Sequence, residues 1–199
     1  MRKSVFPLSK ILVRVGALEF GDFLLSSGKE SPYYVDLSLI FNHPSVLKVV
    51  IELFESEIRD RIGFDDFQRV AGVLKKGIPF ASILSFRLGK PLVMLDKADG
   101  SAAFGAVEPD EKILLVDDMI NVGLTLERCV KWIREKAGAE VQHAVVILDR
   151  LEGGGKRLGR VGVEVHSLAT IREIIDTLLE FGSINEEEYE VIKGEIVRE

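Results

Sequence analysis

Two adjacent carboxylates, Asp117 and Asp118, are the side chains in this sequence best placed to do chemistry. They follow an apolar run, residues 113–116, and precede a short segment, 121–125, that contains a glycine and a threonine. Paired carboxylates in this setting can contact ribose hydroxyls or hold Mg²⁺ through water, since Mg²⁺ favours a few carboxylates together with substrate oxygens. Helix capping needs only one aspartate and leaves the second unpaired. The pattern predicts a site for a nucleotide or a sugar phosphate.

The elements around this pair are expected to be a buried strand and a helix. A continuous apolar run such as 113–116 is typical of a central parallel strand that is covered on both faces. We therefore expect Asp117 and Asp118 at the carboxyl end of that strand, where open α/β sheets bind ligands. A helix is predicted to begin near Leu124, after Gly123 has provided tight backbone geometry, and its first N–H groups form an anion site.

A second anion site is predicted at Lys75 and Lys76. These lysines end a predicted strand, 68–74, and precede a helix that continues through Pro79. Their charge beside the N–H groups of a helix start suits a diphosphate. A solvated lysine pair is the alternative interpretation, and the order of strand, loop and helix favours the diphosphate.

Length, composition and charge limit the class of protein. With 199 residues, of which 47% are hydrophobic, the chain is long enough for one globular domain. It has no uninterrupted apolar run of the roughly 18 residues that suggest a membrane span, and its first residues lack a signal-peptide core, so we expect a cytoplasmic protein without a membrane partner. The net charge of −6 argues against general nucleic-acid binding.

Cysteine and histidine offer little further chemistry. Cys129 is the one cysteine and lies in a predicted helix, so it is interpreted as a core residue and a disulfide framework is excluded. His43, His143 and His166 are scattered without metal-ligand spacing. Each histidine is therefore interpreted as structural.

Hydrophobic periodicity and turn residues predict the other elements. Helices are expected over 8–15, 44–62, 79–88, 124–137, 170–181 and 185–197, and strands over 68–74, 91–95, 141–148 and 161–169. Residues 20–40 are predicted to form a hairpin or a small sub-sheet. Residues 96–111 are expected to be a long loop, and residues 153–155 a flexible turn. Thr170 and Glu173 are expected to form a capping box.

Four segments resemble the type I phosphoribosyltransferases, and the orotate phosphoribosyltransferases in particular. They are the strand with Asp-Asp and its phosphate loop (112–125), Phe-x-Leu-x-Ser-Gly-x-x-Ser-Pro-Tyr (23–33), Gly-x-x-x-Lys-Gly-Ile-Pro (72–79) and Leu-Asp-Arg-x-Glu-Gly (148–153). The resemblance implies a type I phosphoribosyltransferase fold, an α/β fold with a mainly parallel central sheet flanked by helices. It also implies one domain, 1–199, with a small N-terminal hood of about residues 1–42 plus part of the C-terminal segment.

The resemblance further implies a reaction and its residues. The phosphoribosyl group of phosphoribosyl pyrophosphate (PRPP) is transferred to orotate, with Mg²⁺ as cofactor, giving orotidine monophosphate and pyrophosphate. The implied catalytic residues are Lys97, Asp117 and Asp118, and the two aspartates hold the metal indirectly, through water or PRPP. Residues implied in PRPP binding are Lys76, Gly77, Asp117, Asp118, Asn121, Val122, Gly123, Leu124 and Thr125. Residues implied in orotate binding are Lys29, Tyr33, Tyr34 and Arg150.

Arg150 takes the place where the family has an arginine that contacts the orotate carboxylate. A guanidinium fork forms two parallel charge-assisted bonds to a carboxylate, which fixes the orientation of a planar base. The alternative is a loop ion pair between Asp149 and Arg150. The resemblance also implies a homodimer in which the loop 96–110 reaches the neighbouring subunit.

Two departures from the family pattern support a rival hypothesis. The loop 96–111 contains no Arg or His, so Lys97 is its one cation, and Ser26 stands where the family has a lysine. A regulatory protein that senses PRPP or a nucleotide with the same fold would tolerate both changes. An enzyme for another base is a third hypothesis, and Arg150 argues against a purine, which has no carboxylate. An assay of PRPP-dependent orotate loss distinguishes these hypotheses.

Overall fold

A six-stranded sheet forms the centre of the computed structural model, which describes residues 2–24, 28 and 30–197. Its strand order is β5-β4-β3-β6-β7-β8, and every pairing is parallel except that between β4 and β5. The strands are β3 (Arg69–Val73), β4 (Leu92–Leu95), β5 (Ala102–Phe104), β6 (Lys112–Ile120), β7 (Glu140–Asp149) and β8 (Glu164–Thr170). The α/β fold with a mainly parallel central sheet is confirmed.

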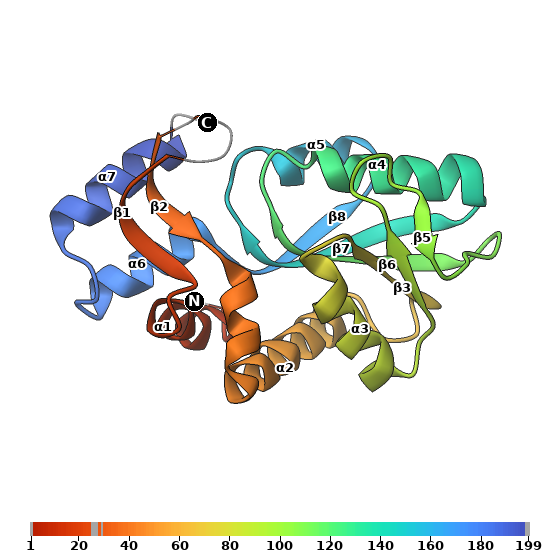
Figure 1. Cartoon of the computed structure of the whole chain (residues 1–199), viewed down its shortest axis with the longest axis horizontal. Coiled ribbons are helices and arrows are strands. Elements are labelled where there is room, and N and C mark those ends of the chain that lie inside the picture. Colours follow the sequence, from red (N-terminus) through yellow and green to blue (C-terminus); the bar gives the residue numbers. More distant parts are fainter. Residues whose placement is uncertain (1, 25–27, 29, 198–199) are drawn as a thin grey trace.

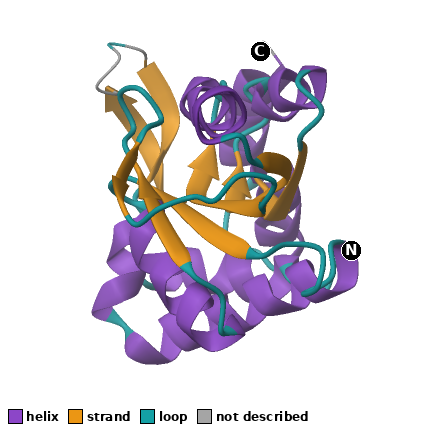
Figure 2. Cartoon of the chain, turned by 90° about the vertical axis from the view of Figure 1, so that its right-hand side faces the viewer, coloured by secondary structure: helices purple, strands orange, loops and turns teal. Residues whose placement is uncertain are grey.

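Helices cover both faces of this sheet (Figures 1 and 2). One face packs against α2 (Pro44–Arg61) and α3 (Gly77–Leu88). The other packs against α4 (Leu124–Trp132), the π-helical turn Ile133–Ala137 and α5 (Gly154–Arg160). Successive residues of β6 alternate between the two buried clusters, because side chains of a strand point to opposite faces. This double cover explains why the strand is apolar without alternation.

An antiparallel hairpin lies beside the sheet, on the left of Figure 1. Its strands are β1 (Leu18–Leu24) and β2 (Glu30–Val35), followed by the 3₁₀ helix Leu37–Asn42. Around it lie α1 (Val5–Arg14), α6 (Ile171–Glu180) and α7 (Glu186–Val197). The predicted hairpin is confirmed. Its buried residues belong to the same cluster as one face of the sheet, so hairpin and sheet share a core.

The central strand is longer than the sequence predicts. Its pairing with β3 ends at Val116, but its pairing with β7 continues to Ile120. The aspartates therefore lie inside β6 and not after it. Strand pairing uses backbone groups, so polar side chains at 117 and 118 do not end it.

Two predicted loops contain regular structure, which corrects the sequence interpretation. Residues 96–111 include β5, which extends the sheet edge beside β4. Residues 154 and 155 open α5, and the flexible turn is reduced to Gly153, whose φ of 89° only glycine adopts readily. Neither short element has an apolar period that a sequence pattern can reveal.

Other expectations about local structure are confirmed. The Thr170 hydroxyl accepts a hydrogen bond from the Glu173 N–H at 3.2 Å, and the Glu173 carboxylate accepts one from the Thr170 N–H at 2.8 Å, which completes the capping box. Cys129 is fully buried, and burial raises the pKa of its thiol to about 12. Among the described residues, no helix combines the length and apolar character needed to cross a membrane.

Candidate functional site

The aspartate pair lies where β6 extends beyond the end of its pairing with β3. Only 6% of Asp118 is exposed, and its Oδ2 atom has no hydrogen-bond partner among the described residues. Asp117 Oδ1 accepts a hydrogen bond from the Asp118 N–H at 2.9 Å. A buried carboxylate oxygen without a donor is costly, so this position is suited to a ligand or a cation.

Burial disfavours the charges of both aspartates, and the charge of Asp118 adds to this effect at Asp117. Desolvation, and then the charge of Asp118, raise the pKa of Asp117 well above its usual value of 3.8. Desolvation also raises the pKa of Asp118. Two lysines oppose these shifts, Lys97 at Asp117 and Lys76 at Asp118. The two lysines implied by the family resemblance are therefore close enough to the carboxylates to act on them electrostatically.

The turn between β3 and α3 is pressed against this pair. A Cβ atom on Gly77 would lie 2.7 Å from Asp117 Oδ1 and 2.8 Å from Asp117 Cα, so only glycine fits there. Lys76 precedes it and forms an ion pair with Asp36, with 3.0 Å between Nζ and Oδ1. Asp36 was missed by sequence reasoning, because it precedes Lys76 by forty residues and belongs to no motif.

Lys97 lies in a turn that is held by its own backbone and by α4. Asp96 N–H donates to the Ser101 carbonyl at 2.7 Å, and Gly100 N–H donates to the Asp96 carbonyl at 2.9 Å. Gly100 packs on α4 so closely that a Cβ atom would lie 2.6 Å from the backbone of Arg128. The exposed Lys97 is thus carried by an ordered turn beside the aspartates.

The segment 121–125 enters α4 through Gly123, which has a φ of 79°. Gly123 lies against Gly154 at the start of α5, where a Cβ atom would be 3.0 Å from the Gly154 Cα atom. Arg157 of α5 supports the segment, because its Nε donates to the Val122 carbonyl at 2.8 Å and its Nη1 pairs with Glu127 at 2.9 Å. Arg157 was not predicted, since no motif includes it.

The predicted phosphate loop is therefore a fixed turn between two helix starts. Val122 and Leu124 expose 46% and 43% of their surface, and because their side chains are apolar, any contact with a phosphate would come from their backbone N–H groups. Asn121 and Thr125 have only partial exposure.

Arg150 and Tyr33 are brought together from opposite ends of the chain. The Arg150 guanidinium lies 4.9 Å from the centre of the Tyr33 ring, and its Nε is 3.3 Å from the Tyr33 hydroxyl and 2.8 Å from Glu152 Oε1. Asp149 instead accepts a hydrogen bond from Leu151 N–H at 2.8 Å, so the ion pair of Arg150 is with Glu152. Glu152 was not predicted as a partner.

The two tyrosines of the predicted base site differ in burial, and its lysine lies outside the described residues. Tyr33 is 2% exposed and Tyr34 is 41% exposed, because neighbouring residues of β2 point to opposite sides. Tyr34 is one of the groups that raise the pKa of Lys76, the lysine of the predicted diphosphate turn. Lys29 and Ser26 lie outside the described residues.

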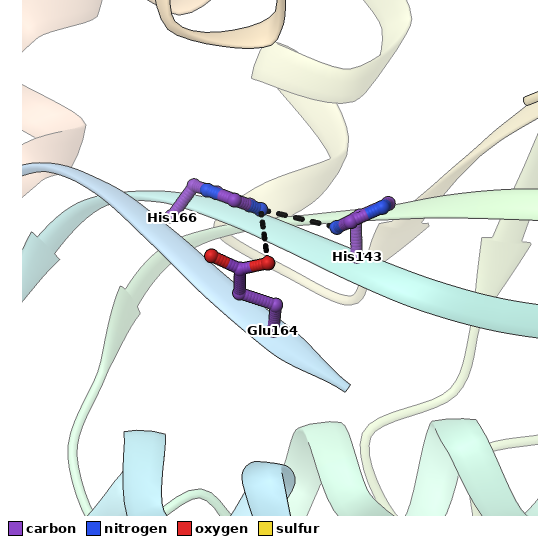
Figure 3. Close-up of side chains that lie close together, drawn as sticks. All are labelled: His143, Glu164 and His166. Atoms are coloured by element: carbon purple, nitrogen blue, oxygen red, sulfur yellow. Dashed lines mark hydrogen bonds and ion pairs between the residues drawn. The ribbon is translucent and has the colours of Figure 1, made fainter. Parts of the chain in front are cut away.

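The histidine interpretation needs one correction. His143 and His166 are 23 residues apart in sequence, but parallel pairing of β7 with β8 brings their rings together beside Glu164 (Figure 3). Only the strand register creates this proximity.

Comparison with known proteins gives a consistent result. Residues 36–164 match the family model described as "Phosphoribosyl transferase domain". The chain is 38% identical over 194 residues to an orotate phosphoribosyltransferase of Sulfurisphaera tokodaii, covering 95% of this chain and 96% of that protein. It is 40% identical over 175 residues to one of Pyrobaculum calidifontis, covering 85% and 88%. The crystal structure of orotate phosphoribosyltransferase from Aeropyrum pernix matches with a TM-score of 0.76 and 31% identity, over 86% of this chain and 98% of that chain.

Proposed function

Since the chain belongs to the phosphoribosyltransferase family, we propose that it transfers the phosphoribosyl group of PRPP to orotate and releases pyrophosphate and orotidine monophosphate. One structural observation carries this proposal. A buried aspartate pair with an unpartnered oxygen lies close to two lysines, inside β6 just beyond the end of its pairing with β3. Cations and a helix start around paired carboxylates suit a pyrophosphorylated sugar.

Each part of PRPP has a matching part of the site. Asp117 and Asp118 take the ribose hydroxyls, and the N–H groups of 121–125 at the start of α4 take the 5-phosphate. Lys76 and the backbone at Gly77 take the diphosphate. Lys97 then supports the diphosphate as it departs, because charge develops there as the bond to C1 breaks.

Arg150 takes the orotate carboxylate. Its contacts with Tyr33 and Glu152 fix the guanidinium plane, so the fork is preorganised and little side-chain entropy is lost on binding. The acceptor nitrogen of the base would then be held near C1 of the ribose. Catalysis in this arrangement comes from positioning and charge stabilisation, without a covalent nucleophile.

Mg²⁺ fits the donor set at the aspartates. The unpartnered Asp118 Oδ2 and the raised pKa values mean that a cation would relieve repulsion and restore a partner. The two carboxylates would hold the ion through water or PRPP oxygens, and when bound it supplies positive charge to the diphosphate.

A homodimer and a cytoplasmic location remain predictions. The predicted dimer places loop 96–110 in the neighbouring subunit, while in the structure Lys97 acts on Asp117 of its own chain. Mixing Lys97→Ala subunits with Asp117→Asn subunits tests the dimer arrangement. Partial recovery of activity indicates a loop that crosses between subunits, and its absence indicates a loop that acts within one chain.

The test of the proposed function is a steady-state assay of orotate loss at several temperatures. We expect loss that requires both PRPP and Mg²⁺ and that is matched by pyrophosphate release. The Asp117→Asn/Asp118→Asn protein is the control for background reaction. A chain that binds PRPP with Mg²⁺ and turns over no orotate at any temperature would instead be the PRPP sensor.

A further inference from the structure

A cluster of two histidines and a glutamate lies on β7 and β8 (Figure 3). His143 Nδ1 is 3.1 Å from His166 Nε2, and His166 Nε2 is 3.9 Å from Glu164 Oε2. One ligand atom from each side chain lies within 4.8 Å of the other two. We propose that His143, Glu164 and His166 bind a divalent transition-metal ion of the zinc class.

The strand register explains how the three side chains meet. Parallel pairing places His143 opposite Glu164 and Val145 opposite His166. Paired residues of neighbouring strands share a face of the sheet, and so do residues two apart on one strand. All three side chains therefore project from the same face, and β8 is an edge strand of the sheet.

The distance between the two imidazole nitrogens is close to that of tetrahedral coordination, and the carboxylate lies within reach. Two nitrogens bound to one zinc ion at about 2.0–2.1 Å with tetrahedral angles are about 3.3–3.4 Å apart. The observed 3.1 Å between the two imidazole nitrogens needs only a small adjustment. The carboxylate of Glu164 must approach His166 Nε2 by about half an ångström from 3.9 Å to reach this spacing, and it must also close on His143, from a separation within 4.8 Å. It is free to do so, because 70% of its side chain is exposed at the start of β8.

The environment favours binding of a metal over binding of a proton. Only 4% of the His166 side chain is exposed, and this desolvation lowers the pKa of its ring. The charge of Glu164 opposes the lowering, whereas His143 and Arg61 add to it. Neutral imidazole is the form that ligates metals. Two nitrogens and one oxygen suit zinc and its neighbours better than Mg²⁺, which prefers oxygen ligands. The exposed Glu164 leaves a path from solvent and a fourth position for water.

The site is separate from the aspartates. His143 pairs with Leu114, three residues before Asp117, which is about 10 Å along the strand. A bound ion would join the starts of β7 and β8 and so stabilise the edge of the sheet, because an ion that binds only the folded state raises its stability.

The test uses the full-length protein, freed of metal with a chelator and titrated with ZnCl₂ in the absence of PRPP. We expect one zinc ion per chain by calorimetry and a rise in the melting temperature that His143→Ala reduces. MgCl₂, which the aspartates can bind, should give only a rise that does not depend on His143. His143→Ala and Glu164→Gln should each lower zinc affinity by about tenfold or more, since each removes a ligand. His43→Ala is the matched control and should bind zinc as the parent does, because His43 lies at the start of α2 and outside the cluster.

Circular dichroism identifies variants that fail to fold. Glu164→Gln changes an exposed side chain, so it should fold even if His143→Ala does not. Zinc binding that persists in both ligand variants and disappears in Asp118→Asn would overturn the proposal, since it places the ion at the aspartates. Absence of zinc binding in the folded parent would also overturn it and leave the histidine pair as a hydrogen bond within the sheet.

Discussion

Lys76 and Asp36 form an ion pair that ties the predicted diphosphate turn to the end of the hairpin, with 3.0 Å between Nζ and Oδ1. Partial burial opposes the charge of Lys76, but the hydrogen bond and the charge of Asp36 outweigh it, so the pKa of Lys76 is raised. The lysine is charged and oriented before a ligand arrives. Binding of a diphosphate must exchange one anionic partner for another.

The first prediction follows from this exchange. Asp36→Asn removes the charge that competes for Lys76. It keeps a side-chain oxygen that can accept the hydrogen bond from the Ser38 N–H, which is 3.2 Å long in the parent. Lys76 is 48% exposed, so the pair contributes only about 0.2–1 kcal/mol. We expect pyrophosphate with Mg²⁺ to bind about 1.5- to 5-fold more tightly, measured by calorimetry. Glu55→Gln is the control, because it removes the ion pair between Glu55 of α2 and Arg87 of α3 and leaves the Lys76–Asp36 pair unchanged. Weaker binding in Asp36→Asn would mean that Asp36 itself holds the ligand.

The second prediction concerns the aspartate pair. Asp117→Asn together with Asp118→Asn should abolish PRPP binding and leave the fold intact, because two like charges buried together cost stability. Calorimetry measures the binding, and unchanged PRPP affinity would exclude this pair from the site.

The stability of the double variant should depend on pH in a defined direction. The folded state raises the pKa of both carboxyls above 3.8, so it binds protons more tightly than the unfolded chain. Their contribution to stability is therefore present below pH 3.8 and is lost as the pH rises through the raised values. We expect the melting temperature of the variant to gain on that of the parent from about pH 4 towards neutrality. A melting temperature of the variant that falls relative to that of the parent over this range would contradict the assignment of the shifts.

The third prediction concerns Arg150. Arg150→Lys keeps the charge beside Glu152 but cannot form a bidentate contact, so orotate binding should weaken by about 1.5–3 kcal/mol while PRPP binding changes little. Uracil should be a poor substitute for orotate in the parent. Tyr33→Phe removes only the 3.3 Å contact with Nε and should have the smaller effect. Equal orotate affinity in Arg150→Lys and the parent would place the base elsewhere.

The fourth prediction concerns Lys97. Lys97→Ala should lower kcat by about a hundredfold or more, because a charge placed on the departing diphosphate in a water-poor site acts mainly in the transition state. PRPP affinity should change much less. Lys112→Ala, an exposed lysine at the other end of β6, is the matched control. An equal loss of kcat in both variants, or a loss confined to PRPP affinity, would contradict this role.

The amino-acid sequence by itself determined the local elements and the order of the motifs. The apolar run before Asp117, the capping box at Thr170 and the helix stop at Gly138 depend on nearby residues and general propensities. For this reason the parallel α/β fold could be predicted, and so could the association of the aspartates with the central strand, although the strand extends past them to Ile120. The family resemblance then supplied the reaction, which the relatives' names support.

Tertiary structure alone decided which distant residues meet. The contacts of Asp36 with Lys76, of Arg150 with Tyr33 and of Arg157 with Val122 join segments separated by 35 to 117 residues. The histidine cluster depends on a strand register that a one-residue shift would destroy, since it would turn the side chains to the other face. Such contacts arise from the packing of whole elements, and a local sequence pattern carries no information about them.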